Sequence, residues 1–182
     1  MNKFDPIRLL DGHGMYINNC LDNVESLSVI IENKGFEEDF RQNGSSSGWR
    51  YILNAKDEEY EIIDSAMAKA ADIFLTSTNR SINDYTKMEQ DYKIFKWFTP
   101  RNTMLQHTDH WYVGDKLITP DITLVMYLTG DFDGGKLVFG ELDIKIQPQA
   151  GDIAVFDSTT LHGVEPVWSG RRITVQSSLF KK

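Results

Sequence analysis

The sequence predicts an α+β fold in which a helical first half precedes a β-rich second half. Apolar residues recur at three- and four-residue spacing before residue 88, and short apolar runs bounded by turn residues follow from residue 89. The length of 182 residues fits one domain. Strands at near-regular intervals are typical of a sandwich or barrel such as a jelly roll. We expect a single domain, 1–182, with 1–88 mainly helical support and 89–182 forming the β core.

Two helices are expected in the first half. Asp22 and Glu25 form a capping-box pattern for the first helix, and Lys34-Gly35 supplies its C-terminal stop. The second helix is expected to begin at Asp57. Its apolar positions are Tyr60, Ile63, Met67, Ala70 and Phe74.

Six apolar runs in the second half predict strands. They cover residues 92–98, 122–128, 136–139, 142–146, 153–156 and 172–180. In the first half, the stretch from Gly44 to Gly48 lies between the two predicted helices and indicates a surface loop. The alternative is a mobile lid over residues 44–48, whose neighbours Trp49 or Arg50 contact substrate.

The charge balance argues against nucleic acid as a partner. Asp and Glu number 27 against 19 Lys and Arg, which gives a net charge of -8, whereas duplex-binding surfaces need clustered positive charge. Cys20 is the only cysteine, so the chain has no internal disulfide. The N-terminus lacks the apolar core of a signal peptide, and no window is apolar enough to span a membrane. We therefore expect a cytoplasmic protein without a membrane partner.

One pattern in the second half predicts a metal-binding site. In His107-Thr108-Asp109, residues i and i+2 of a strand would present an imidazole and a carboxylate on the same face. His162 follows the strand 153–156 and is the natural third ligand. Two histidines and one carboxylate on one face of an octahedron describe a non-heme Fe(II) oxygenase site. Alone, His-x-Asp is a weak signal, because either residue is often an ordinary polar group in a loop.

Arg172 strengthens the interpretation because it begins the next predicted strand after His162. Its planar guanidinium, with donors in a fixed fork, suits the distal carboxylate of a dicarboxylic acid. The alternative is a solvated arginine at the surface of a strand.

With these residues in place, the sequence resembles the Fe(II)- and 2-oxoglutarate-dependent dioxygenases, in particular the prolyl 4-hydroxylase-like family. The family's His-x-Asp…His motif falls on His107, Asp109 and His162, and its co-substrate arginine falls on Arg172, with Arg171 as the competitor. Three further stretches resemble family segments over roughly residues 92–180. They are Thr123 to Leu128, Gly134 to Phe139 and Pro148 to Phe156.

The resemblance implies a double-stranded β-helix (jelly roll) core buttressed by N-terminal helices. It also implies Fe(II) on His107, Asp109 and His162, and 2-oxoglutarate held by Arg172 and Tyr127. The reaction would use O2, give succinate and CO2 as co-products and draw on ascorbate as reductant. The chain departs from the family at Gln176 to Phe180, where an aromatic residue is common, and at Asp121, where a basic residue is common.

The leading hypothesis is a hydroxylase of prolyl residues in a peptide or protein. Trp111 and Tyr112 follow the metal motif, where they could form an apolar wall for a prolyl ring, although aromatic residues there more often serve packing. One alternative is a hydroxylase of a free amino acid or another small molecule. Another is a non-catalytic jelly-roll protein that binds the metal or ligand without turnover.

Overall fold

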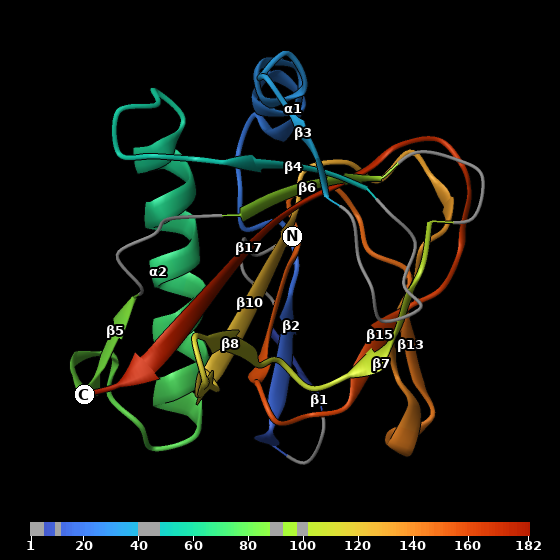
Figure 1. Cartoon of the computed structure of the whole chain (residues 1–182). Coiled ribbons are helices and arrows are strands. Elements are labelled where there is room, and N and C mark those ends of the chain that lie inside the picture. The colour runs from blue at the N-terminus through green and yellow to red at the C-terminus, as the bar shows by residue number, and fades with distance from the viewer. Residues whose placement is uncertain (1–5, 10–11, 40–47, 88–92, 98–101) are drawn as a thin grey trace.

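The computed structural model describes residues 6–9, 12–39, 48–87, 93–97 and 102–182. Its centre is a nine-stranded antiparallel sheet, the major sheet, which Figure 1 shows beside the long helix α2 (Tyr60–Ser77). The strands follow the order β1 (Pro6–Leu9), β2 (Gly14–Ile17), β14 (Ile153–Asp157), β10 (Ile122–Tyr127), β17 (Arg172–Lys181), β6 (Lys93–Trp97), β4 (Gly48–Ile52) and β3 (Glu37–Asp39), and β5 (Tyr85–Lys87) pairs with β17.

A second antiparallel sheet of four strands, the minor sheet, covers the face of the major sheet that is opposite to α2. Its order is β13 (Ile144–Ile146), β12 (Leu137–Phe139), β15 (His162–Val164) and β7 (Met104–His107). Two short ribbons complete the β structure. They are β11 (Asp133–Gly134) with β16 (Val167–Ser169), and β8 (Trp111–Val113) with β9 (Lys116–Ile118). This arrangement is the predicted jelly roll.

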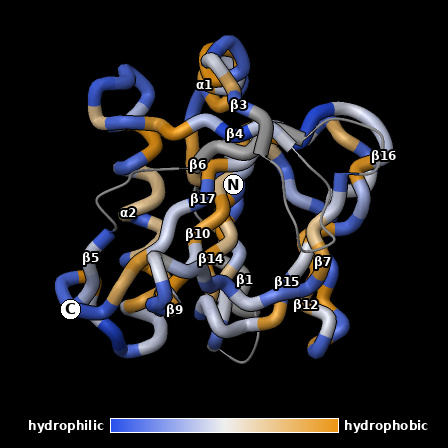
Figure 2. The backbone as a smooth tube through the Cα atoms, in the orientation of Figure 1, coloured by the Kyte–Doolittle hydropathy of each residue, from blue (hydrophilic) through white to orange (hydrophobic). Residues whose placement is uncertain are grey.

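Two central strands of the major sheet, β10 and β14, are largely apolar on both faces, which explains their nearly continuous hydrophobic sequences. On β10, Leu124 and Met126 face the cluster around α2, whereas Tyr127 packs with Leu137 and Phe139 of the minor sheet. The same alternation holds along β14. In Figure 2, hydrophobic residues gather along α2 and β10, and the outer turns are hydrophilic. The major sheet therefore separates two cores.

The six strands predicted from the apolar runs are present, each within two residues of its expected ends. Two helices are also present in the first half, α1 (Val24–Glu32) and α2. However, this half also contributes β1 to β5 to the major sheet. The expectation that residues 1–88 are mainly helical therefore describes only α1 and α2 and misses these strands. Such strands are three to five residues long, and an apolar run of that length carries too little periodicity to identify a strand.

The start of α1 differs from the predicted capping box. The N-cap is Asn23, with φ of 56° in the left-handed region, and its side chain makes no capping hydrogen bond. Asn tolerates this backbone conformation better than most residues, which is why the chain can turn sharply into α1 here. The second helix begins at Tyr60 rather than Asp57. None of the helices in the described part of the chain combines the length and the apolar character needed to cross a membrane.

The contact between α2 and the major sheet gives a test with a matched control one residue away. Ile63 is fully buried, whereas 52% of Ile62 is exposed. We expect Ile63→Ala to lower the free energy of unfolding by about 2–5 kcal/mol, because it leaves a cavity. Ile62→Ala should change this free energy by no more than about 0.5 kcal/mol. Urea denaturation of both variants measures the difference, and equal losses would contradict the packing described here.

Candidate metal centre

Two histidines and one carboxylate meet between the two sheets. His107 is the last residue of β7 and His162 the first of β15, and the two are directly paired across these strands. Their ring centroids lie 4.5 Å apart. The Nε2 atom of His107 lies 3.6 Å from Oδ1 of Asp109, and Nε2 of His162 lies 3.7 Å from Oδ2. Potential ligand atoms of all three residues lie within 4.8 Å of one another, which fits a single metal ion.

Backbone hydrogen bonds orient both imidazoles for metal binding. Nδ1 of His107 lies 2.8 Å from the carbonyl oxygen of Leu105, and Nδ1 of His162 lies 2.9 Å from that of Thr160. A carbonyl only accepts, so each Nδ1 carries the proton and donates it. Each Nε2 then keeps its lone pair for a metal, as in metal-binding histidines whose other nitrogen is held by an outer partner.

Asp109 reaches the site from a loop rather than from a strand. β7 ends at His107, so the expectation that both residues share one strand face is wrong. The backbone N–H of Asp109 instead donates to the carbonyl of Ser158 at 3.0 Å. The hydroxyl of Thr123 donates to Oδ2 of Asp109 at 2.5 Å, a length typical of a bond to a charged carboxylate.

The surroundings favour the protonation states that bind a metal. Burial raises the pKa of Asp109, but the neighbouring imidazoles of His107 and His162 and the hydrogen bond from Thr123 outweigh burial and hold this pKa below its usual range. Burial lowers the pKa of His162, whose ring packs against Phe156 at a centroid distance of 4.6 Å. A deprotonated carboxylate and a neutral imidazole are therefore both favoured near neutral pH.

Arg172 is the buried arginine of the site. Only 3% of it is exposed, its Nε donates to the carbonyl of Gly135 at 3.2 Å, and its guanidinium lies 5.1 Å from the centre of the Tyr127 ring. Burial lowers the pKa of this guanidinium, which still remains charged at any physiological pH. Arg171 instead points outward and pairs with Glu32 on α1. Of the two candidates, the structure therefore brings only Arg172 into the site.

Position 135 requires a glycine because a side chain there would collide with its neighbours. Its φ is +60°, and a Cβ there would meet the Phe132 ring at 3.0 Å and Cδ of Arg172 at 3.1 Å. A side chain would push the arginine away from the carbonyl that holds it. Thr129 secures the backbone beside Arg172, because its hydroxyl donates to the carbonyl of Arg171 and accepts from the N–H of Ile173.

The buried hydroxyl of Tyr127 can donate a hydrogen bond to a ligand in the site. The side chain is fully buried, and its hydroxyl makes no hydrogen bond with the described part of the chain. Burial raises the pKa of Tyr127, and the guanidinium of Arg172 opposes this rise. An unsatisfied buried hydroxyl is costly, so it indicates a missing partner. An acceptor such as a carboxylate beside Arg172 would satisfy it.

The Pro148 to Phe156 stretch positions Tyr127. Asp152 is buried, and its carboxylate accepts hydrogen bonds from the Tyr16 hydroxyl at 2.6 Å and from the N–H of Gln149. Its backbone carbonyl accepts from the N–H of Tyr127, and the N–H of Gly151 donates to the carbonyl of Tyr127. Asp152 therefore fixes the turn that holds Tyr127 in place, which explains the Gly-Asp pair of this segment.

A cavity of about 80 Å³ joins the metal ligands to Arg172. It is lined by Met104, His107, Asp109, Val125, Leu137, His162, Val164, Arg172, Thr174 and Gln176. Thr174 and Gln176 alternate with buried core residues along β17, so they share the face of Arg172. Thr174 and Gln176 were not among the residues predicted from the sequence, although polar residues at every second position of a buried strand are a detectable signal.

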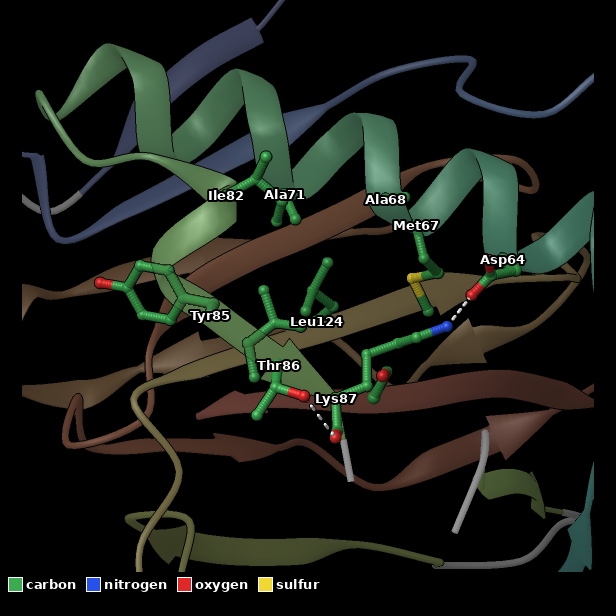
Figure 3. A pocket seen from close by; sticks show the side chains of 11 residues that line it. Asp64, Met67, Ala68, Ala71, Ile82, Tyr85, Thr86, Lys87 and Leu124 are labelled. Atoms are coloured by element: carbon green, nitrogen blue, oxygen red, sulfur yellow. Dashed lines mark hydrogen bonds and ion pairs between the residues drawn. The ribbon is translucent and has the colours of Figure 1, made fainter. Parts of the chain in front are cut away.

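A larger cavity of about 310 Å³ lies between α2 and the major sheet, and Figure 3 shows it. Leu124 and Met67 line it, and Lys87 reaches from β5 to Asp64 of α2 at its edge. No residue lines both cavities. The His-Asp-His cluster belongs to the smaller cavity, which makes that cavity the candidate active site.

The residues predicted to contact substrate are dispersed. Trp49 is in register with Ile173 through β6, on the face of the major sheet that packs against α2, so Trp49 lies on the wrong face for the site. Arg50 is in register with Thr174 and is on the cavity side of the sheet. Neither lines the cavity. Residues 44–47 of the predicted loop or lid lie outside the described residues, and Gly48 begins β4.

The aromatic residues after the metal motif form a hairpin beside the site. Trp111 packs edge-on against Phe180 with ring centroids 5.9 Å apart, and 67% of Tyr112 is exposed. Neither residue lines the cavity. Trp111 therefore takes part in packing, and substrate contact by Trp111 or Tyr112 stays a prediction.

Comparisons with known proteins agree with this geometry. Residues 94–178 match the model of the 2OG-Fe(II) oxygenase superfamily, where 2OG is 2-oxoglutarate. In fold, the chain is similar to the viral collagen prolyl hydroxylase of Paramecium Bursaria Chlorella virus-1, with a TM-score of 0.70 at 24% identity, over 94% of this chain and 98% of the viral one.

Two curated relatives match shorter stretches. Prolyl 3-hydroxylase 1 of Homo sapiens is 44% identical over 62 residues, which cover 30% of this chain and 8% of the human protein. A PKHD-type hydroxylase of Colwellia psychrerythraea is 38% identical over 64 residues, which cover 33% of this chain and 29% of the relative. These matches span well under half of each relative. Together with the jelly-roll core and the His-Asp-His cluster, they show that the chain is similar to the 2OG-Fe(II) oxygenases over residues 94–178, and in particular to the prolyl hydroxylases among them.

Proposed function

We propose that this enzyme hydroxylates prolyl residues in a peptide or protein, with 2-oxoglutarate as co-substrate. The names of the similar proteins support this substrate class, because the viral structure is a collagen prolyl hydroxylase and the human relative is a prolyl 3-hydroxylase. Fe(II), when bound together with 2-oxoglutarate, supplies the oxidation of a C–H bond by O2, with succinate and CO2 as co-products. Ascorbate as the reductant and a cytoplasmic location stay predictions.

The donor set fits Fe(II). Two neutral imidazoles and one carboxylate are the ligands of the facial triad in non-heme Fe(II) oxygenases, and they leave the opposite positions open. His107, Asp109 and His162 would hold the ion, and the cavity adjoins them on one side. Their hydrogen bonds to Leu105, Thr123 and Thr160 keep the ligands oriented before the ion arrives.

The single observation that carries the proposal is that this cavity contacts both the triad and Arg172. A buried guanidinium binds a carboxylate strongly, and a five-carbon dicarboxylate could place one carboxylate at Arg172 and its keto-acid end at the metal. Arg172 would bind the distal carboxylate in a bidentate manner, and the unpartnered Tyr127 hydroxyl would donate to the same group. The exclusion of water strengthens both interactions.

The substrate class can be tested with three matched compounds. The enzyme, supplied with Fe(II), 2-oxoglutarate, ascorbate and O2, is incubated with a Pro-containing peptide, the same peptide with Ala at each Pro, and free L-proline. We expect succinate formation and a mass gain of one oxygen atom only with the Pro-containing peptide. Preferential hydroxylation of free proline would instead support the small-molecule alternative.

The metal assignment predicts complete loss of turnover when a histidine ligand is removed. His107→Ala and His162→Ala should each lower the affinity for Fe(II) by more than the 10- to 100-fold that is typical of losing an outer partner. Anaerobic titration followed by metal analysis measures the affinity. Full activity in either variant would show that the triad is assigned incorrectly.

The two neighbouring arginines provide a matched pair for the co-substrate. Arg172→Ala should weaken the binding of 2-oxoglutarate by about 2–5 kcal/mol, because it leaves a buried carboxylate without its charged partner, while metal binding persists. Arg171→Ala should change this binding by no more than about 0.5 kcal/mol, because Arg171 is exposed. The visible absorption band of the Fe(II) protein with 2-oxoglutarate, recorded without O2, measures both affinities. The reverse result would transfer the role to Arg171.

A further inference from the structure

Two buried hydroxyl groups lie behind the carboxylate of the metal centre. Thr123 on β10 and Ser158, just after β14, are both fully buried, and neither lines the active-site cavity. The Oγ1 atom of Thr123 lies 2.5 Å from Oδ2 of Asp109 and 2.8 Å from Oγ of Ser158. A buried threonine in an apolar strand lowers the stability of the fold unless its hydroxyl is hydrogen-bonded, and here both hydrogen-bonding partners of Thr123 are polar side chains.

The direction of each hydrogen bond follows from counting protons. Each hydroxyl carries one proton, and an ionised carboxylate can only accept. The proton of Thr123 is therefore donated to Asp109, and Ser158 must donate its own proton to Thr123. The result is a chain from Ser158 through Thr123 to Asp109, in which each bond polarises and strengthens the next.

This chain distinguishes the two oxygens of the carboxylate. Each oxygen lies near one imidazole, Oδ1 at 3.6 Å from Nε2 of His107 and Oδ2 at 3.7 Å from Nε2 of His162, but Thr123 donates its hydrogen bond to Oδ2 alone. Asp109 also lies in a loop, where no strand pairing holds its side chain in place. Ser158 fixes that loop as well, because its carbonyl accepts the backbone N–H of Asp109 and its own N–H donates to the carbonyl of Asp121.

We propose that Thr123 and Ser158 are positioning residues of the metal centre, which hold Oδ2 of Asp109 so that Oδ1 is the single carboxylate atom that binds the ion. This inference deepens the proposed function and rests on its metal site. Neither hydroxyl touches the metal or the substrates. Their effect is to set the angle of the carboxylate before the ion binds, so that binding requires no rearrangement of the loop.

The test is a titration of the apoprotein with Co(II), whose visible absorption reports both affinity and ligand geometry. Thr123→Val keeps the shape of the side chain but removes the hydroxyl, and should weaken Co(II) binding by about 10- to 100-fold and alter the absorption bands. Thr123→Ser removes only the methyl group and should bind Co(II) as the original protein does. Ser158→Ala leaves the last bond of the chain in place and should weaken binding by about tenfold.

Three results would overturn the inference. They are unchanged Co(II) affinity and spectrum in Thr123→Val, an equal loss in Thr123→Ser, and unchanged binding in Ser158→Ala. The last comparison decides the matter if Thr123→Val does not fold, which circular dichroism would reveal. His107→Ala separates this inference from the proposed function. If His107→Ala also binds Co(II) normally, the metal site itself is assigned incorrectly. If His107→Ala loses Co(II) binding while the Thr123 and Ser158 variants bind Co(II) normally, only the positioning role is refuted.

Discussion

The pairing of His107 with His162 across β7 and β15 is the constraint on which the site depends. It places two imidazoles at one point although 54 residues separate them in the chain. The strands must approach closely there, and Gly163 permits this, because a Cβ at that position would lie 2.8 Å from the carbonyl oxygen of Met104. The loop after β7 then needs only two residues to bring Asp109 to the same point. The minor sheet and this loop thus supply every ligand of the metal centre.

The major sheet supplies the other half of the chemistry. Arg172 and Tyr127 lie on its inner face, opposite the histidines, so the spacing between the two sheets sets the distance from the metal to the co-substrate anchor. A buried guanidinium is costly, and the carbonyl of Gly135 and the face of the Tyr127 ring are among the groups that stabilise it here. Its charge would bind the carboxylate of a dicarboxylic acid more strongly than it would bind a neutral ligand.

Local patterns in the sequence predicted much of this structure. Runs such as 122–128 and 153–156 are long and apolar enough to identify strands, and the glycines between them mark turns. The His-x-Asp pattern, His162 and Arg172 were sufficient to identify the candidate site. The choice between Arg171 and Arg172 was not local, because it depends on which face of β17 is buried against the minor sheet.

Other features depend on contacts between distant segments and had no local signature. β2 and β5 are short and pair with strands that come much later in the chain, β14 and β17. Trp49 seemed suited to substrate contact because it follows a glycine- and serine-rich stretch, but strand register decides which face it occupies. Thr123 was visible as a polar interruption of an apolar strand, yet its partners Asp109 and Ser158 meet it only in the folded protein.

The alternation along β17 has a consequence for how this protein can vary in sequence. Its even-numbered positions 172, 174 and 176 face the active site, and the odd-numbered Ile173, Val175 and Leu179 fill the core beneath α2. Inserting or deleting one residue within this strand would exchange the two faces, so that a charge would enter the core and an isoleucine would block the cavity. We therefore expect that substitutions can occur along residues 172–176 but that changes in chain length cannot.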